Sequence, residues 1–273
     1  MNDYEEVTRG KELLGRLSAH GESLFQVISD IRSIDAELGD QFNETYKHHL
    51  STDLFDTFVS CWSVCTPESG DHDNLAMWRG YAADGNGVAI VIDPIALGLP
   101  DLFESEIVIY RVHYETDQEF ALRALKVLEH FRDNLKKIEK SVLRANVGYA
   151  INAFAEVCFL LAITHKHSGF KQEREWRFVW RRHKDHDGTY TSLVRAVSGR
   201  RGMYEYFCFP IKPDERITSA PLDIRKIIKE VMIGPTDDSY LKARTVKTLL
   251  AAAGFDLAQT AVTISPIPYR TLR

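Results

Sequence analysis

The sequence lacks a surplus of positive charge, and this absence bears first on what the protein binds. Its 273 residues include Lys+Arg 34 against Asp+Glu 39, which gives a formal net charge of −5. A protein whose main ligand is nucleic acid usually carries a basic field that neutralises phosphates. No such field extends over the whole chain, whereas 44% hydrophobic residues suffice for a substantial core.

The chain also lacks a hydrophobic run long enough to cross a bilayer. The most apolar stretch is "YAINAFAEVCFLLAI", residues 149–163, and it contains Asn152 and Glu156. A membrane span needs roughly 18 or more apolar residues, so this stretch predicts a central buried helix. We see no targeting segment, and four scattered cysteines suggest reduced thiols, so we expect a cytoplasmic protein without a membrane partner.

Several cofactor and metal motifs are missing as well. The turn "DGNG" at residues 84–87 lacks the GK[ST] end of a phosphate loop and the GxGxxG of a dinucleotide fingerprint. Cys61 and Cys65 form a CxxxC, but no second close pair completes a zinc site. We therefore predict no bound metal.

What the chain contains is an alternation of helical and strand patterns, which predicts the α+β class. Apolar residues recur every three or four positions over 3–19 and 22–49, within a helical N-terminal part, 1–50. A helical insertion is predicted at about 116–165, broken near 138–141. The sequence patterns predict strands at residues 57–64, 88–93, 106–114, 174–182, 191–197, 203–211, 227–233 and 260–265. Without repeats or linkers, we expect a single domain over residues 1–273, with a further helix at 238–253.

The stretch "GFKQEREWRFVW", residues 169–180, carries the main chemical signal. In an extended strand Glu173, Glu175 and Arg177 share one face, and the aromatic side chains occupy the other. The aromatic face predicts core, which leaves both glutamates outward with Arg177 near enough to compensate one of them. Adjacent carboxylates repel unless a cation, a proton or a ligand hydroxyl relieves them. A solvated strand edge and an active site both explain such a pair.

A second candidate cluster lies in "LAMWRGYAA", residues 75–83. Trp78 and Tyr81 are three residues apart, hence on one helical face. They would either seal the helix onto a sheet or form a flat wall for an aromatic ligand such as nicotinamide. In the second case Arg79 or the tyrosine hydroxyl would supply polar contacts.

Four segments together resemble a known family. They are "MNDYEEV", "FVSCWS", "LAMWRGYAADGNGVAIVID" and "GFKQEREWRFV", which span about residues 1–235. This pattern resembles the bacterial domain-of-unknown-function family 2971. That family is similar to ADP-ribosyltransferase-like domains, which split NAD and pass on the ADP-ribose. The resemblance implies an ADP-ribosyltransferase-like mixed or antiparallel split sheet, NAD as the substrate, and an acceptor that is a protein or a nucleic acid.

The same resemblance implies roles for individual residues. Many ADP-ribosyltransferases carry an aromatic residue, a Gln or Glu three residues later, and the catalytic Glu two residues after that. Phe170, Glu173 and Glu175 have this spacing. Glu175 would bind the ribose 2′-hydroxyl and stabilise oxocarbenium-like charge, while Glu173 would position or deprotonate the acceptor. The resemblance also implies that Ser60 and Ser63 belong to the strand that supports the NAD pocket and that Trp78 and Tyr81 stack on nicotinamide. We add Arg79, Phe170 and Arg177 as further candidate NAD-binding residues.

The chain departs from the family at its start. The family usually begins with a segment resembling "LYHYTS…L…IL…G…L", whose histidine anchors NAD in the histidine-type transferases, whereas this sequence opens at Met1 of "MNDYEEV". We expect either an internal methionine start or a shortened protein with an incomplete NAD site.

Three functions compete at this point. The first is an NAD-consuming enzyme that acts as a toxin or effector in defence against phages. The second is a metal-dependent nuclease that uses Asp93, Glu173 and Glu175. A lysine beside the acidic pair would favour the nuclease, and Lys171 is near but on the loop side. The third is a non-catalytic binding module of the same fold. The sequence leaves the oligomeric state open.

Overall fold

A computed structural model describes most of the chain, and it divides that part into two units. The described residues are 3–19, 26, 29–30, 32–33, 36–37, 39–42, 44, 48, 57–65, 73–93, 95–96, 108–182, 188, 191–199, 202–208 and 224–268. The first unit is Met1–Trp62 with Ile109–Val179, and the second is Ser63–Val108 with Trp180–Arg273. Most of the helix predicted over 22–49 lies outside the described residues, and the positions described there are helical.

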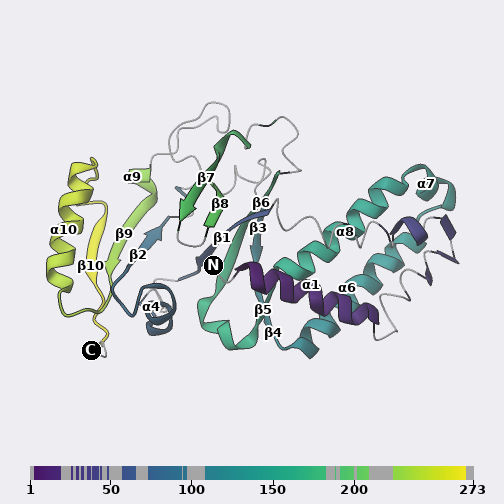
Figure 1. Ribbon diagram of the computed structural model, residues 1–273, viewed down its shortest axis with the longest axis horizontal. Helices are drawn as coiled ribbons and strands as arrows, with labels where there is room; N and C mark the ends of the chain where they lie inside the picture. The colour runs from purple at the N-terminus through teal and green to yellow at the C-terminus, as the bar shows by residue number, and fades with distance from the viewer. Residues whose placement is uncertain are drawn as a thin grey trace. The chain divides into compact units, whose positions relative to one another are not determined.

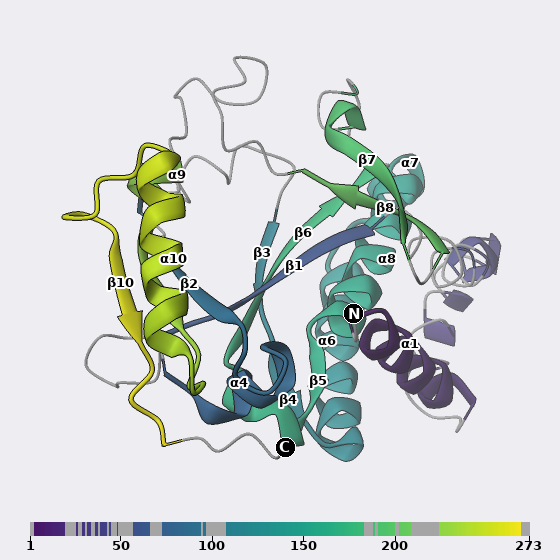
Figure 2. The same cartoon turned by 60° about the vertical axis from the view of Figure 1, so that its left-hand side comes forward.

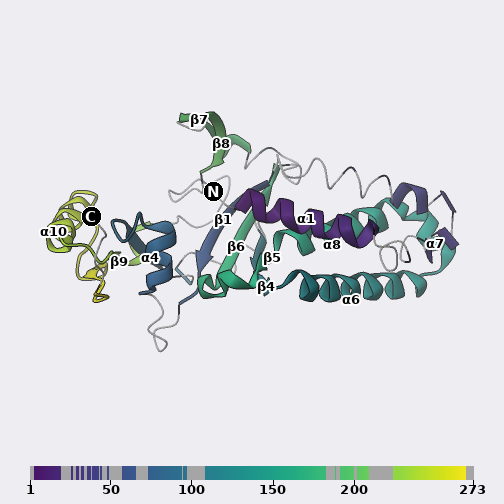
Figure 3. The same ribbon diagram turned by 60° about the horizontal axis from the view of Figure 1, so that its bottom comes forward.

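The first unit places three long helices beside a small sheet. Its described elements are α1 (Asp3–Ala19), β1 (Thr57–Ser63), β3 (Val108–Arg111), β4 (His113–Glu115), α6 (Asp117–Lys136), α7 (Lys140–Ala145), α8 (Val147–Ile163), β5 (His165–His167), the 3-10 helix η2 (Ser168–Glu173) and β6 (Glu175–Arg181). Figures 1 and 3 show α1, α6 and α8 running side by side. The sheet order is β1-β6-β3, so β6 is central in this sheet.

Helix α8 is the predicted buried helix, and it has two apolar faces because it packs on two layers. One face carries Phe154, Cys158 and Leu161 into a core shared with α1 and α6. The other face carries Phe159 and Ile163 against Val179 of β6. In the part of the chain that the structure describes, no helix combines the length and apolar composition needed to cross a membrane.

The expected strand over 106–114 is in fact two strands in two sheets. Strand β3 pairs with β6, whereas β4 pairs in parallel with β5. The backbone changes partners at Val112: its N–H donates to the Glu175 carbonyl at 3.1 Å, and the next N–H, of His113, donates to the Thr164 carbonyl at 2.7 Å. Strand β5 was not predicted: the predicted helical insertion ends at about residue 165, and three residues are too few to show a period.

The second unit contains a mixed sheet with a helix beside it and an antiparallel strand pair. Its described elements are α4 (Leu75–Tyr81), β2 (Val88–Ile92), the 3-10 helix η4 (Thr191–Leu193), β7 (Val194–Gly199), β8 (Gly202–Phe207), α9 (Ile224–Ile227), β9 (Ile228–Ile233), α10 (Ser239–Ala252) and β10 (Ala261–Ile264). Strand β9 pairs in parallel with β10 and antiparallel with β2. Helix α10 contacts both β10 and β9, and Figure 2 shows it alongside β10. The α+β class and the helical insertion are confirmed, whereas the single domain and the ADP-ribosyltransferase-like arrangement stay predictions.

Two glycines of α1 offer a matched test of the packing between α1 and α8. A Cβ added at Gly10 would lie 2.6 Å from the Ala162 carbonyl oxygen, whereas one at Gly15 would meet no described atom within 4 Å. Alanine is the better helix former by about 1 kcal/mol at either position. We expect Gly15→Ala to raise the free energy of unfolding by up to ~1 kcal/mol. Gly10→Ala should lower it by about 1–3 kcal/mol through overpacking. Urea denaturation of both variants measures these changes. Equal changes in the free energy of unfolding would contradict the close packing of α1 on α8 at Gly10.

Candidate active site

The two glutamates meet at the start of β6, where η2 ends. Glu173 is the last residue of η2 and Glu175 is the first of β6. Between them Arg174 has φ 46 and ψ 47, a left-handed conformation that is uncommon for a residue with a side chain. Such conformations persist where the surroundings enforce them, and they cluster at functional sites. The pair therefore sits at a kink that the fold maintains.

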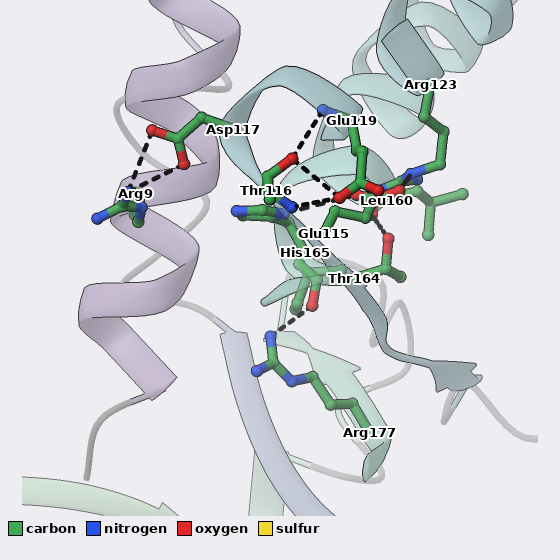
Figure 4. A network of polar contacts seen from close by, with 11 residues as sticks. Arg9, Glu115, Thr116, Asp117, Glu119, Arg123, Leu160, Thr164, His165 and Arg177 are labelled. Carbon is green, nitrogen blue, oxygen red and sulfur yellow. Dashed lines mark hydrogen bonds and ion pairs between the residues drawn. The ribbon is translucent and has the colours of Figure 1, made fainter. Parts of the chain in front are cut away.

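Both carboxylates converge on one buried ammonium group. Lys166 Nζ lies 2.5 Å from Glu173 Oε2 and 2.7 Å from Glu175 Oε2. The other oxygen of Glu175, Oε1, accepts a hydrogen bond from Arg177 Nε at 2.6 Å. Arg177 also donates through Nη1 to the Ile163 carbonyl at the end of α8, as Figure 4 shows. Two carboxylates and two cations thus meet in one buried cluster.

Burial of this cluster corrects the sequence prediction. Alternation assigned the faces of β6 correctly, but the charged face is buried: Arg177 is 0% and Glu175 is 4% exposed, whereas Trp176 is 38% exposed. The charged face points toward α8, because Val179 on the same face packs against Phe159 and Ile163. Burial is tolerated because each charge has an opposite partner. Trp180 is buried as predicted.

Tyr114 joins the cluster from β4. Its hydroxyl accepts a hydrogen bond from the Glu175 backbone N–H at 2.6 Å. Burial raises the pKa of Tyr114 to about 12, and the charges of Glu175 and Glu173 act in the same direction. The hydroxyl therefore stays protonated over the whole neutral range and keeps its own proton available as a donor.

The carboxyl of Glu175 is ionised despite its burial. Burial by itself would raise the pKa of Glu175, but the hydrogen bond and charge of Arg177, the thiol of Cys61 and the ammonium of Lys166 outweigh it and lower the pKa below its usual value. A carboxylate in a low-dielectric environment interacts strongly with developing positive charge. The site can therefore stabilise a cationic transition state.

A second ion cluster occupies the other face of the β4–β5 pair. Glu115 accepts from Arg123 Nε at 2.6 Å and lies 3.5 Å from His165 Nδ1, and Figure 4 shows this group. The His165 ring lies 4.6 Å from the Phe120 ring between centroids. Thr116 and Glu119 cap the start of α6 reciprocally, and Arg9 of α1 pairs with Asp117 at 2.9 Å. These contacts fasten β4 to the helices and support the strand that carries Tyr114.

The two serines of strand β1 do not lie beside Glu175, where the resemblance to ADP-ribosyltransferases would place them. Ser60 accepts a hydrogen bond from Trp62 Nε1 at 2.9 Å, and the Trp62 ring lies 5.7 Å from that of Phe178. Ser60 is therefore on the face opposite Glu175, because strand side chains alternate. The β1 side chain that reaches Glu175 is Cys61. Ser63 is exposed at the end of β1.

Phe170 stands beside the acidic pair. It belongs to η2, its side chain is 43% exposed, and Lys166 Nζ lies 5.3 Å from its ring centroid. The ring thus contacts the solvent and also lies near the buried ammonium group, at a cation–π distance.

The residues expected to stack on nicotinamide belong to the second unit. Trp78 is buried against Met232 and Ala82, and its Nε1 donates to Asp73 Oδ1 at 2.6 Å. For Trp78 this burial fits the first of the two alternatives, a helix sealed onto a sheet, whereas Tyr81 is 61% exposed. Arg79 is exposed on the same helix.

Metal ligands do not gather in the described residues. There, no group of three or more His, Cys, Asp or Glu side chains could hold a metal ion. Cys61 is exposed and Cys65 is half-buried, and neither forms a disulfide. Asp93 belongs to the second unit, where it accepts from the Ile95 N–H at 2.9 Å and lies 3.5 Å from Lys229 Nζ.

Sequence reasoning missed Lys166 and Tyr114. Neither stands near Glu175 in a recognisable motif, and both lie in three-residue strands whose pairing is non-local. Tyr114 and Lys166 are register partners in that pairing, which places them side by side. The sequence signal for this strand is the three-residue polar segment "HKH", which is too short to show a strand period.

Residues 77–178 match the model of the family described as "Protein of unknown function (DUF2971)". This confirms the predicted resemblance to domain-of-unknown-function family 2971 over those residues, which include the acidic pair. No curated protein and no solved structure matches the chain. The similarity to ADP-ribosyltransferases stays a prediction.

The paired carboxylates predict a pH dependence of stability. The pKa values of Glu115 and Glu175 are both lowered in the fold from a starting value of 4.5: burial opposes the shift, and partners led by His165 for Glu115 and by Arg177 for Glu175 outweigh it. A carboxyl whose pKa is lowered by folding stabilises the folded protein at every pH above its pKa in the unfolded chain. This stabilisation is lost as the pH falls through the pKa of the same group in the folded protein. We expect the urea midpoint to fall most steeply below pH 4.5, and less steeply in Glu115→Gln. Urea denaturation between pH 3 and 7 checks this, and a midpoint that rises on acidification would contradict it.

Proposed function

We propose that the protein is an ADP-ribosyltransferase-like, NAD-consuming enzyme that cleaves the bond between nicotinamide and ribose. One observation carries the proposal: Glu173 and Glu175 converge on a single buried centre, within 2.7 Å of Lys166 Nζ, at the start of a central strand. The spacing to Phe170, which lies beside that centre, supports the same assignment. The proposal includes a role as a toxin or effector, because depletion of NAD arrests a cell.

Each group has a defined task in this reaction. The bond between ribose C1′ and the nicotinamide nitrogen breaks, and its electron pair leaves with nicotinamide, which becomes neutral. Glu175 binds a ribose hydroxyl and stabilises the positive charge that develops on the sugar, as carboxylates do in glycoside cleavage. Glu173 accepts the proton of the water or acceptor hydroxyl that attacks C1′. The burial of both carboxylates strengthens these interactions.

Substrate binding has to rearrange the cluster. Lys166 holds Glu175 Oε2 and Arg177 holds Oε1. In the proposed complex a ribose hydroxyl replaces Lys166 on Oε2, while Arg177 remains on Oε1 and keeps the carboxylate oriented. Arg177 is 0% exposed, so we assign it to the orientation of Glu175 rather than to contact with NAD.

The direct test is NAD turnover by the full chain. Purified protein is incubated with NAD, and free nicotinamide and ADP-ribose are separated by chromatography. Equal amounts of the two products indicate hydrolysis, and nicotinamide without equivalent ADP-ribose indicates transfer to an acceptor. Addition of cell extract, fractionated into protein and nucleic acid, then identifies the acceptor class. No nicotinamide release under any of these conditions would refute the proposal.

A second candidate is a non-catalytic binding module, and one observation favours it. Glu175 is 4% exposed and both of its oxygens are already paired, which is also what a purely structural ion cluster would show. The two candidates differ in NAD binding. A ligand present at 100 times its Kd stabilises the fold by about 2.7 kcal/mol, so an enzyme should show a raised Tm with a non-hydrolysable NAD analogue. An unchanged Tm would favour the module.

The nuclease is not favoured by the geometry, although a lysine does lie beside the acidic pair. That lysine is Lys166, and its ammonium group lies between the two carboxylates, in the position that a divalent cation would need. Lys171, the residue considered from the sequence, is exposed on η2. The described residues also contain no group of three or more His, Cys, Asp or Glu side chains that could hold a metal ion.

A further inference from the structure

Lys166 is the residue of the cluster for which the proposed reaction provides no chemical step. It lies in β5, and its side chain is 1% exposed. Lysine is almost never fully buried unless it is paired, because an isolated ammonium loses its hydration. Here it contacts carboxylates from two elements, Glu173 of η2 and Glu175 of β6. Its position is therefore set by these charges.

The charge balance of the cluster depends on this ammonium group. The titratable and charged side chains that face it are Tyr114 from β4, Glu173 from η2, Glu175 and Arg177 from β6, and Cys61 from β1 through Glu175. Arg177 serves Glu175 Oε1 and the Ile163 carbonyl. Without Lys166, the two neighbouring buried carboxylates would lose the cation that they share. Their mutual repulsion would then raise the pKa of one of them, so that it takes up a proton more readily.

We propose that Lys166 is the positioning residue of the acidic pair: its ammonium bridges Glu173 and Glu175 and keeps both carboxylates ionised at neutral pH. Its role in catalysis rests on the proposed function, whereas its role in charge balance does not. During the reaction Glu175 needs its negative charge for the sugar cation, and Glu173 must be unprotonated to accept a proton. In the free protein Lys166 makes both conditions hold together, and it stays on Glu173 when a ribose hydroxyl takes its place on Glu175 Oε2.

Three variants test this role. Lys166→Met removes the charge and keeps the length, Lys166→Arg keeps the charge, and Lys171→Met removes an exposed lysine of η2 as a matched control. In Lys166→Met one carboxyl should be protonated at pH 7, visible as the C=O stretching band of a carboxylic acid in the infrared spectrum. The acidic limb of the pH profile for nicotinamide release should move up by at least about one unit. Lys166→Arg should restore both readouts in large part, and Lys171→Met should match the wild type.

The stability readout does not require activity. A carboxyl whose folded pKa is raised stabilises the fold at low pH and loses this contribution as pH rises. The urea midpoint of Lys166→Met should therefore increase from pH 8 to pH 5, relative to the wild type. If the wild type releases no nicotinamide, the proposed function fails, and this midpoint and the infrared band still decide the role of Lys166. An unprotonated pair in Lys166→Met would overturn the proposal.

A double variant covers the case in which Lys166→Met does not fold. Removing one carboxylate together with the ammonium restores the balance, so Lys166→Met combined with Glu173→Gln should be more stable than Lys166→Met alone. Far-UV circular dichroism and urea denaturation compare the two proteins. Equal instability of the double and single variants would show that packing of the lysine stem, rather than its charge, holds the cluster together.

Discussion

Replacing Glu175 with glutamine is expected to lower the rate of nicotinamide release from NAD by about 100- to 1,000-fold. Glutamine has the same shape and keeps an acceptor for Arg177 Nε, which lies 2.6 Å from the carboxylate. It has no negative charge to offset the cation that forms on the ribose. The loss should therefore fall on kcat rather than on KM, because that charge is greatest in the transition state. Steady-state kinetics at pH 7 measure both.

The control for this variant is Glu115→Gln, on the opposite face of the β4–β5 pair. Glu115 is also a partly buried carboxylate that pairs with an arginine, Arg123, at 2.6 Å. Its loss should lower stability while nicotinamide release stays within a few fold of the wild type. Far-UV circular dichroism and Tm establish that both variants are folded. Full turnover by a folded Glu175→Gln would refute the catalytic assignment. Growth of cells that express each variant gives a parallel readout of toxicity.

Replacing Arg177 with methionine is expected to lower the free energy of unfolding by about 3–5 kcal/mol. The side chain is fully buried, and it donates to Glu175 and to the Ile163 carbonyl. Removing it leaves an acceptor at the end of α8 and a carboxylate oxygen in the interior, and each costs free energy when unpaired. Methionine fills a similar volume, so the loss reports on charge and hydrogen bonding rather than on a cavity. Urea denaturation at pH 7 measures it.

The matched comparison is Arg9→Met in the same unit. Arg9 pairs with Asp117 at 2.9 Å, but the two side chains are 51% and 44% exposed. Exposed ion pairs contribute about 0–1 kcal/mol because water screens them and long side chains lose entropy. If Arg9→Met and Arg177→Met lower the free energy of unfolding by the same amount, burial of the β6 cluster does not determine how much the cluster contributes to stability.

Most helices and strands of the described chain were predictable because their signals are local. Periodicity identified α1, α8 and α10 within a residue or two of their observed ends. The failures share one cause. Strand β5 and the division of residues 108–115 between two sheets depend on which distant segment each backbone group meets, and a few residues of sequence do not specify that partner. The face of β6 that carries charge was assigned outward because charged residues usually lie outside.

The acidic pair shows the same division between local and distant information. The sequence by itself determined that Glu175 and Arg177 share one face of β6, because strand alternation sets those positions within a few residues. Glu173 lies outside that strand, at the end of η2, and reaches the same cluster beside the left-handed residue Arg174. Only the tertiary structure decided that the pair is buried, and that Lys166 and Tyr114 complete the cluster. The physical reason is that two carboxylates enter a protein interior only with matching cations, and the second cation comes from another strand.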